Sequence, residues 1–548
     1  LTANRWRIWE SRFQDDGSLT PPEALELIEQ EDVDNYDACY LPDGRLIFCS
    51  TACFTGVPCV NGSSHVCNLY LKENDGSVRQ LTIEQDHDWC PTVMNNGRVM
   101  YLRWEYTDLP HCYSRILFHM NPDGTNQSEL YGSGSYWPEA MFYARPIPND
   151  PTKFVAIIGG HHDQPRIGEM VLFDPGVARR EAEGAVQKIP GYGKKVQPII
   201  CDLPINQVWP KFTHPFPISD TLFLASRQDR AGGAWEIVLL DIYDNVTVLA
   251  SDESAGLLEP IPLRPTEKPP VIPDRINPSS QTADVFIADV YSGKGLAGVE
   301  RGTIKSIRLI SYQFAYQGMG AEPYSVGLDG PWDPKTILGT VPVNDDGSAS
   351  FRIPAMMPVA FQMLDADGKA VQLMRSWITA MPGESISCIG CHEDQNQTGA
   401  AAPRSVASKS KAIDITPFYG PARGFSFRRE IQPILDHYCV DCHGAGDAAP
   451  DLRDGKEHPL QENTLSINTF ALFSPSYVNL RSFVRTPTKE SQMPTLRPFE
   501  FYADSTRLVQ LLQNGHHDVQ LDKESWDRLL TWIDLNAPFH GNWGDINR

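Results

Sequence analysis

Apolar and polar residues alternate in short runs over residues 31–257, and turn residues separate these runs. Turn signals precede strand-like runs at residues 42–44 (Pro-Asp-Gly), 95–97 (Asn-Asn-Gly), 150–153 (Asp-Pro-Thr-Lys) and 219–220 (Ser-Asp). Short runs bounded by Gly, Pro, Asn or Asp are typical of strands. The turns recur at intervals of 53 to 69 residues, and a repeated turn and strand is typical of propeller blades. We therefore expect a β-propeller over residues 31–265, with six blades, or seven.

Different patterns flank this region. Residues 1–30 form a lead-in, with a short helix expected over residues 21–30. Residues 258–275 are rich in proline, which removes backbone donors and stiffens the chain, so they are typical of a linker. Strand-like runs resume at residues 284–290, 303–312, 348–353 and 360–364. They predict a smaller β-rich domain over residues 266–412.

The hydrophobic period becomes helical in the last part of the chain. Phe427, Ile431, Ile434, Leu435 and Tyr438 follow the spacing of one face of an amphipathic helix. A second helix is expected over residues 505–513, and Gly515 just after it would form its C-terminal cap. A third helix is expected over residues 526–533. The fold class we expect is therefore mainly β, with a helical C-terminal domain over residues 413–548.

Composition narrows the class of protein. The chain has 548 residues and a net charge of −22. This charge argues against a nucleic-acid-binding protein, because contacts with phosphates need clustered Lys and Arg. No apolar run reaches the length of about 18 residues that a membrane-spanning helix needs. The first residue is Leu rather than Met, which favours a processed form whose targeting peptide has been removed.

A pattern of chemical interest, Cys-x-x-Cys-His, occurs twice. The first copy is Cys388-Ile389-Gly390-Cys391-His392, and the second is Cys439-Val440-Asp441-Cys442-His443. In this pattern two thiols form thioethers with haem vinyl groups and the adjacent His ligates the iron. A four-cysteine zinc site is the alternative, but it needs about 15–20 residues between its pairs, whereas 47 separate Cys391 from Cys439. We expect two covalently bound haem c groups.

The remaining iron ligands decide what each haem does. Two strong protein ligands favour electron transfer, whereas an open position permits substrate chemistry. For the second copy, His443 is the expected proximal ligand, and His516, His517 and Met493 are the distal candidates in that order. No distal candidate stands out for the first copy, so we expect its haem to be the reactive centre.

Potential metal ligands also gather in the propeller region. His161 and His162 follow the end of a predicted strand, and Cys112 follows His111. Loops at blade ends line the axial mouth of a propeller, where such side chains can converge. Cys and His are ligands that suit zinc. Hydrogen bonding in turns is the competing role for the two histidines.

These features together resemble a known family. The match rests on residues 101–108 with His111, on residues 160–162, on residues 339–354 with 388–393, and on residues 515–517 with 532–538. On these motifs the chain resembles the α subunits of hydrazine synthase and their relatives. The resemblance implies a six-bladed propeller, a middle domain with one haem c, and a C-terminal cytochrome domain with a bis-His haem.

The resemblance also implies roles for single residues. In that family the haem of the middle domain is the proposed site where nitric oxide and ammonium-derived nitrogen are activated. The His of its attachment motif shares a zinc ion with a propeller Cys, which corresponds to His392 and Cys112 here. A Tyr four residues after that His ligates the iron, and this chain has Asn396 instead. Asp37 is the expected counterpart of a functional acid, and His161 and His162 complete the expected catalytic set.

Two functions follow from these observations. The first is an oxidoreductase that converts a small nitrogen compound at the middle haem and relays electrons through the C-terminal haem. The second is an electron-transfer or docking cytochrome without catalysis of its own. Both imply partner subunits or redox cytochromes. Both also imply a compartment outside the cytoplasm, such as the periplasm, because haem c is normally attached there.

Overall fold

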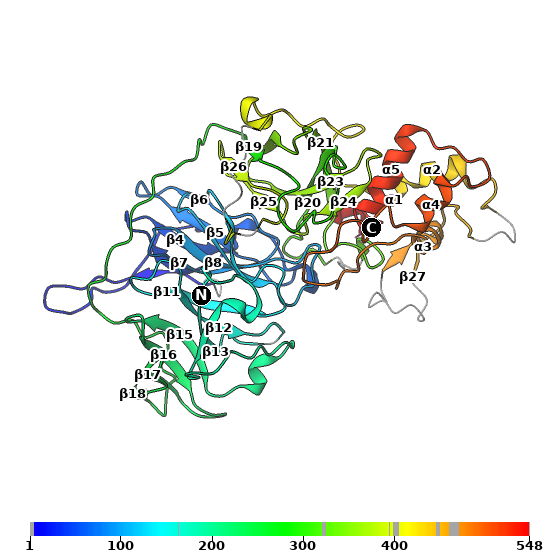
Figure 1. The fold of residues 1–548 in the computed structure, drawn as a ribbon. Helices are drawn as coiled ribbons and strands as arrows, with labels where there is room; N and C mark the ends of the chain where they lie inside the picture. The colour runs from blue at the N-terminus through cyan, green and yellow to red at the C-terminus, as the bar shows by residue number, and fades with distance from the viewer. Residues whose placement is uncertain are drawn as a thin grey trace. The chain divides into compact units, whose positions relative to one another are not determined.

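The structure of the chain is a computed structural model, and it falls into two compact units (Figure 1). It describes residues 5–162, 164–320, 325–393, 395–397, 405–444, 450–459 and 471–546. Unit 1 comprises residues 1–54, 66–105 and 112–276, and unit 2 comprises residues 55–65, 106–111 and 277–548. Two short segments from the N-terminal half of the chain therefore belong to unit 2.

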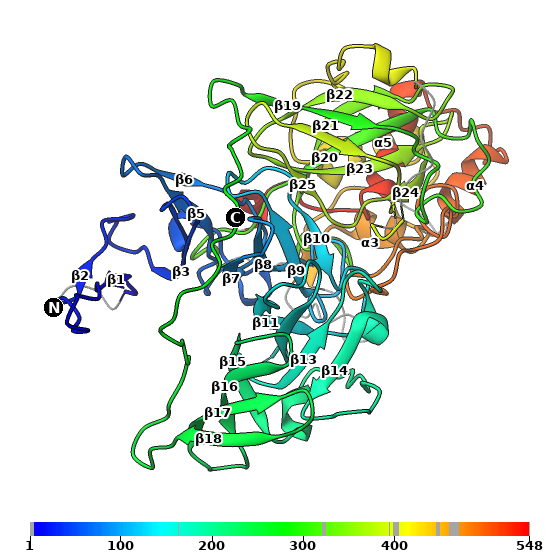
Figure 2. The same ribbon diagram turned by 60° about the vertical axis from the view of Figure 1, so that its left-hand side comes forward.

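Unit 1 is built from four-stranded antiparallel meanders. Their strands are β3 (Asn35–Tyr40), β4 (Leu46–Ser50), β5 (Asn68–Lys72) and β6 (Val78–Gln80); β7 (Asp88–Val93), β8 (Val99–Trp104), β9 (Arg115–Met120) and β10 (Ser128–Tyr131); β11 (Ala140–Pro146), β12 (Phe154–Gly159), β13 (Glu169–Phe173) and β14 (Ala185–Ile189); and β15 (Lys211–Pro217), β16 (Leu222–Gln228), β17 (Trp235–Asp241) and β18 (Val246–Ala250). The last meander is the clearest in Figures 1 and 2, where its strands run side by side in chain order. The second strand of each of the first three meanders, β4, β8 or β12, is buried along its whole length, as expected for an apolar strand covered on both faces.

The predicted fold class, mainly β with a helical C-terminal part, is confirmed. Each of the four turn signals lies between the first and second strands of a meander, and Gly44 and Gly97 have the positive φ that such turns require. The blade count differs, because the described part of unit 1 forms four meanders rather than six. The interval of 53 to 69 residues between turns is one whole blade with its loops, which is longer than a common blade period of about 40 residues.

The lead-in contains a hairpin instead of the expected helix. Strands β1 (Trp9–Glu10) and β2 (Glu23–Ala24) pair antiparallel, and residues 25–30 form no helix. A helix of fewer than about 12 residues is marginal without tertiary packing. This segment is mostly exposed, so little apolar contact is there to stabilise one.

The middle part of unit 2 contains two sheets. One contains β19 (Thr282–Ile287), β22 (Ala349–Pro354) and β26 (Ser385–Cys388), and the other contains β20 (Ser306–Tyr312), β21 (Lys335–Pro342), β23 (Pro358–Leu364), β24 (Ala370–Leu373) and β25 (Ile378–Thr379). All four predicted strand runs of this region are confirmed. Their inward side chains share one apolar core, which includes Val285, Leu309 and Phe361.

The C-terminal part of unit 2 is helical, as predicted. Its helices are α1 (Phe427–Glu430), α2 (Gln432–Tyr438), α3 (Pro475–Arg481), α4 (Arg507–Gln513), α5 (Lys523–Asp534) and α6 (Trp543–Ile546), with a short hairpin of β27 (His458–Pro459) and β28 (Leu472–Phe473). Their core takes in Ile310 and Ile337 of the neighbouring sheet. Asp534 of α5 also pairs with Arg308 of β20 at 3.2 Å, with both side chains buried. Helices and sheet are thus held together by apolar and ionic contacts.

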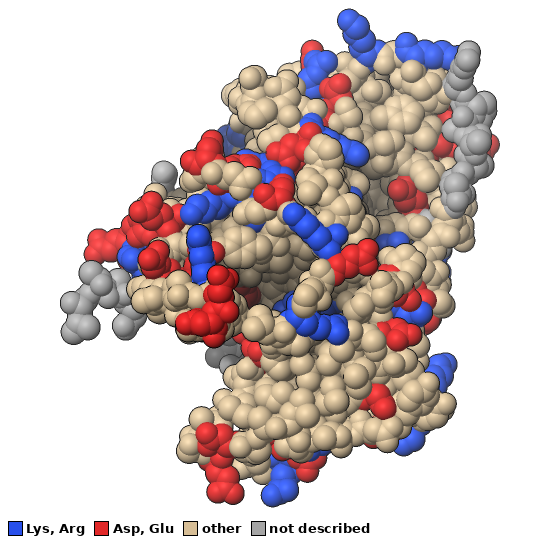
Figure 3. All heavy atoms as spheres, turned by 90° about the vertical axis from the view of Figure 1, so that its left-hand side faces the viewer, with Lys and Arg blue, Asp and Glu red and all other residues tan. Residues whose placement is uncertain are grey.

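The surface carries charges of both signs. On the face shown in Figure 3, Lys and Arg side chains are interspersed with Asp and Glu, so this face has no continuous basic patch of the kind that binds nucleic acid. Among the described residues, no helix has the length and apolar character needed to cross a membrane.

Candidate functional site

The second Cys-x-x-Cys-His copy is positioned by a helix. Buried side chains of α1 and α2, Phe427, Ile431, Ile434 and Leu435, anchor these helices in the C-terminal core. Cys439 then follows α2 directly, and its N–H donates to Leu435 at 2.9 Å. The turn closes when the His443 N–H donates to the Cys439 carbonyl at 2.8 Å. The amphipathic helix therefore sets where both thiols and the histidine lie.

His443 faces His516. Their ring centres are 5.9 Å apart and their planes are inclined by 22°. Metal–imidazole bonds are about 2 Å long, so an iron held between two imidazoles needs ring centres about 6 Å apart. His443 Nδ1 donates to the Pro450 carbonyl at 3.1 Å, which leaves Nε2 as the nitrogen available to a metal and fixes the ring, as is usual for metal-ligating histidines. The geometry of this pair fits an iron with two axial histidines.

The other two distal candidates lie differently. The ring of His517 contacts His516 edge-on, with centres 4.8 Å apart, so it flanks the ring that faces His443. Met493 is buried, and its backbone carbonyl accepts from Arg375 at 3.0 Å. Of the three candidates, His516 is the one whose ring lies near-parallel to the ring of His443, at a distance that an iron could occupy.

The first Cys-x-x-Cys-His copy is positioned by a strand and a glycine loop. Cys388 ends β26, which pairs parallel with β19, and residues 289–295 wrap around the motif. Gly295 and Lys294 donate backbone hydrogen bonds to the carbonyls of Cys391 and His392 at 3.1 Å each. At Gly293, which has positive φ, a side chain would collide with this backbone, because an added Cβ would lie 2.3 Å from the Cys391 carbonyl oxygen. Glycine is therefore required for the close approach.

The side chains of the first copy are unequal in exposure. Cys388 and Cys391 pack against the middle core, and burial raises their pKa values to about 11 and about 12, so both are neutral thiols near pH 7. His392 and Asn396 are exposed. Glu393 closes the motif by accepting from the backbone N–H groups of Ile389 and Gly390. The two thiols are thus anchored in the domain. The histidine is more exposed, yet partial desolvation and the charge of Arg375 lower its pKa below the ordinary value.

A group of potential metal ligands lies in the propeller unit. Cys112 comes from the loop between β8 and β9, and His161 and His162 come from the equivalent loop between β12 and β13 of the next meander. These three side chains offer ligand atoms that all lie within 4.8 Å of one another. One thiol and imidazole nitrogens at this spacing are a donor set that suits zinc.

Two acidic residues accompany this group. Asp202 accepts from His162 Nδ1 at 2.9 Å and from the Cys112 thiol at 3.7 Å. Partial burial acts to raise the pKa of Asp202, but the hydrogen bonds from His162 and Cys112 hold it below its ordinary value. Glu139 is 2% exposed, and burial raises its pKa to about 8, with a further contribution from Asp202 and an opposing one from Arg115. The first acid orients a histidine, and the second lies deeper.

Asp37 lies elsewhere in unit 1. Its carboxylate pairs with Arg166 at 3.1 Å and also accepts from the Cys90 N–H. His392 and Cys112, which the family resemblance joins through one zinc ion, belong to different units, and their pairing stays a prediction. Sequence reasoning missed Asp202, Glu139 and Arg115. No motif marks them, since each is isolated in the sequence and meets the histidines only through the fold.

Comparison with known proteins points to one family. A family model described as the hydrazine synthase alpha subunit middle domain matches residues 302–393, which span β20 to β26 and the first Cys-x-x-Cys-His copy. The hydrazine synthase subunit alpha of Kuenenia stuttgartiensis is 24% identical over 259 residues. That match spans 35% of this chain and 30% of the relative's length.

The fold comparison extends over more of the chain. The solved structure of Kuenenia stuttgartiensis hydrazine synthase aligns with a TM-score of 0.68 at 16% identity, covering 98% of this chain and 80% of that one. Identity at this level shows the fold alone, and the family model adds sequence-level similarity over the middle domain. Residues 302–393 are therefore similar in sequence to the middle domain of hydrazine synthase alpha subunits, and the chain shares the fold of the solved hydrazine synthase structure.

Proposed function

We propose that this protein is a dihaem c-type oxidoreductase. Small nitrogen compounds would react at the Cys388–His392 motif, and electrons would pass through the Cys439–His443 motif. The observation that carries the proposal is the near-parallel pair of His443 and His516 rings, with centres 5.9 Å apart and Nδ1 of His443 held by a backbone carbonyl. This spacing suits an iron held between two imidazole nitrogens.

The residues of the two motifs support different roles. Bound haem would supply one-electron redox chemistry and, where the protein provides only one iron ligand, small-molecule binding. His443 and His516 would both hold the iron at the second motif, which favours electron relay. At the first motif, His392 is exposed, and Asn396 lies four residues after it. The Asn396 amide is a weaker iron ligand than the tyrosine that the family resemblance leads us to expect at this position. This difference favours substrate chemistry at the first motif.

The propeller ligand group would hold a zinc ion. Cys112, His161 and His162 supply one thiolate and two imidazoles, and Asp202 would fix the ring of His162 through Nδ1, leaving Nε2 for the metal. Whether His392 completes the same centre, as the resemblance implies, is part of the proposal. Partner subunits are also proposed, because the named relative is one subunit of its enzyme. A compartment outside the cytoplasm is proposed because haem c is normally attached there.

Spectroscopy of the purified full chain tests the proposal. Intact mass should exceed that of the polypeptide by two haem groups, and metal analysis should give one zinc per chain. Resting spectra should contain one low-spin bis-His haem and one high-spin haem, and nitric oxide should bind the high-spin one. Two low-spin haems that do not bind nitric oxide would instead favour the electron-transfer role without catalysis. A colourless protein would contradict both the oxidoreductase and the electron-transfer hypotheses.

A further inference from the structure

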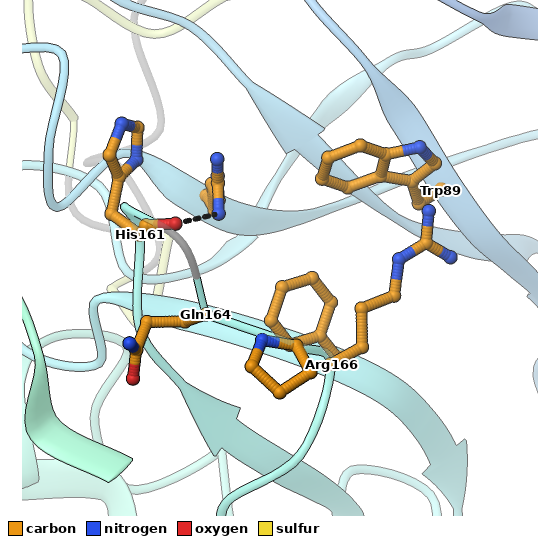
Figure 4. Close-up of a pocket in the computed structure, with 7 residues that line it drawn as sticks. Trp89, His161, Gln164 and Arg166 are labelled. Carbon is orange, nitrogen blue, oxygen red and sulfur yellow. Dashed lines mark hydrogen bonds between the residues drawn. The ribbon is translucent and has the colours of Figure 1, made fainter. Parts of the chain in front are cut away.

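A pocket of about 430 Å³ opens beside His161 in unit 1 (Figure 4). This volume lies within the range of about 300–1,000 Å³ that is usual for small-ligand sites. Trp89, Phe142 and Pro165 form apolar walls, Gln164 and His161 add polar groups, and Arg115 and Arg166 contribute guanidinium groups. In Figure 4, Trp89 and Arg166 lie on one side of the pocket and His161 and Gln164 on the other.

Both arginines are held in place by defined contacts. Arg115 Nη1 donates to the carbonyls of Gly160 and His161 at 3.2 and 3.3 Å, and its Cζ lies 4.2 Å from the centre of the Trp104 ring. Arg166 pairs with Asp37 at 3.1 Å, and its Cζ lies 4.4 Å from the centre of the Trp89 ring. Stacking on aromatic rings fixes the planar forks and reduces the entropy that binding must overcome.

The charge of the pocket wall is one-sided. Two of its seven lining residues are arginines, and none is acidic. The nearby carboxylates stand outside the wall, since Asp37 lies against Arg166 and Glu139 is 2% exposed. A ligand in the pocket therefore meets two guanidinium groups between low-dielectric walls, an arrangement that favours anions, although Asp37 balances part of the charge of Arg166. A guanidinium fork matches two oxygens of one anion, as in its bidentate pairs with carboxylates and phosphates.

We propose that the pocket between Arg115 and Arg166 binds a small monoanion with a planar oxygen-bearing head, the class that includes nitrite and simple carboxylates. The inference rests on the proposed function in one respect, because His161 belongs both to this pocket and to the proposed zinc site. An anion held there would lie beside the metal centre, as a substrate or a product of its chemistry would. The apolar walls of Trp89, Phe142 and Pro165 would accommodate a carboxylate with a small apolar body.

Calorimetric titration of the full chain tests this assignment. The probes are sodium nitrite for the inorganic source, sodium benzoate for the organic one, and benzamide as a neutral match for benzoate. Nitrite or benzoate should bind, and benzamide should not. Arg166→Gln should weaken binding about tenfold or more, as expected for the loss of one charge-assisted pair, and Arg166→Lys should fall between that variant and the parent. Arg180→Gln, at an exposed arginine of the same unit, should have no effect.

Several outcomes would overturn the assignment. Benzamide binding as well as benzoate would show an apolar pocket without anion selectivity. Equal affinity for nitrite or benzoate in the parent chain and in Arg166→Gln would show that Arg166 does not contribute to the site. The Arg166 side chain is 28% exposed, so its variants should fold, and circular dichroism checks this. Haem and zinc content are recorded on the same samples, so arginine-dependent binding by a protein without haem or zinc would sustain this inference while the proposed function failed.

Discussion

The two Cys-x-x-Cys-His copies share a pattern but not a setting. The C-terminal copy follows helix α2 and presents its histidine to a second histidine. The middle copy ends strand β26, is wrapped by a glycine loop, and presents its histidine to the surface. In the proposed function the five residues would attach a haem, whereas a second iron ligand would come from residues far away in the chain. The same pattern would then serve two redox roles within one molecule.

The largest expected effect comes from removing each thiol pair. The double variants Cys388→Ala/Cys391→Ala and Cys439→Ala/Cys442→Ala should each lose about half of the covalent haem, because thioethers hold the group in place. Intact mass and the absorbance of the pyridine haemochrome measure the loss. Cys112→Ala, which lies in neither pair, should keep both groups. Unchanged haem content in either double variant would refute the attachment.

Removing the facing histidine should change the second site alone. In His516→Ala the low-spin bis-His signal should disappear entirely and be replaced by a high-spin signal, since one axial ligand is lost. Electron paramagnetic resonance measures the conversion. His517→Ala is the matched control, because His517 is the neighbouring imidazole, and it should retain the low-spin signal. The opposite result in the two variants would assign the ligand to His517.

Asn396→Tyr should make the first site more like that of the relatives with a tyrosine. A phenolate bound to the iron would compete with added ligands, so the affinity of the first haem for nitric oxide should fall about tenfold. Absorption titration follows this change. Gln395→Tyr, at the adjacent exposed residue, should leave the affinity unaltered. An equal fall in both variants would point to crowding rather than ligation.

The smallest expected effect concerns the loop of the middle copy. Glu393→Gln weakens the charge-assisted bonds to the Ile389 and Gly390 N–H groups, so the free energy of unfolding should fall by about 1–2 kcal/mol. Urea denaturation measures it. Asp441→Asn, at the exposed acid inside the other copy, should change stability by less than about 0.5 kcal/mol. A larger effect at Asp441 would reverse the contrast between the copies.

Local signals in the sequence predicted much of this structure. Turn residues marked the first hairpin of every meander, and the apolar spacing from Phe427 to Tyr438 marked the helices that lead to Cys439. His516 is the first distal candidate because of its position just after the end of a predicted helix. Each of these features depends on neighbours within about a dozen residues, a range over which hydrophobic period and turn chemistry act directly.

Features that depend on distant contacts could not be predicted. Asp202 meets Cys112 and His162 only because equivalent loops of successive meanders and a later connection converge. The number of meanders depended on loop lengths that no period revealed, and the helix expected at residues 21–30 had no apolar surface to pack against. Such features are fixed by strand register and tertiary packing, which a single chain does not display as a pattern.

The assignment of residues 55–65 and 106–111 to unit 2 bears on how the chain is made. Asp108, in the second of these segments, has its counter-ion in Lys335 at 2.6 Å, with the lysine side chain fully enclosed. During synthesis Asp108 is made more than 200 residues before that lysine, so its carboxylate stays solvated and unpaired with Lys335 until the lysine has been synthesised. A gene truncated near residue 276 would leave this carboxylate permanently unmatched, and we would expect such a fragment to aggregate or to be degraded.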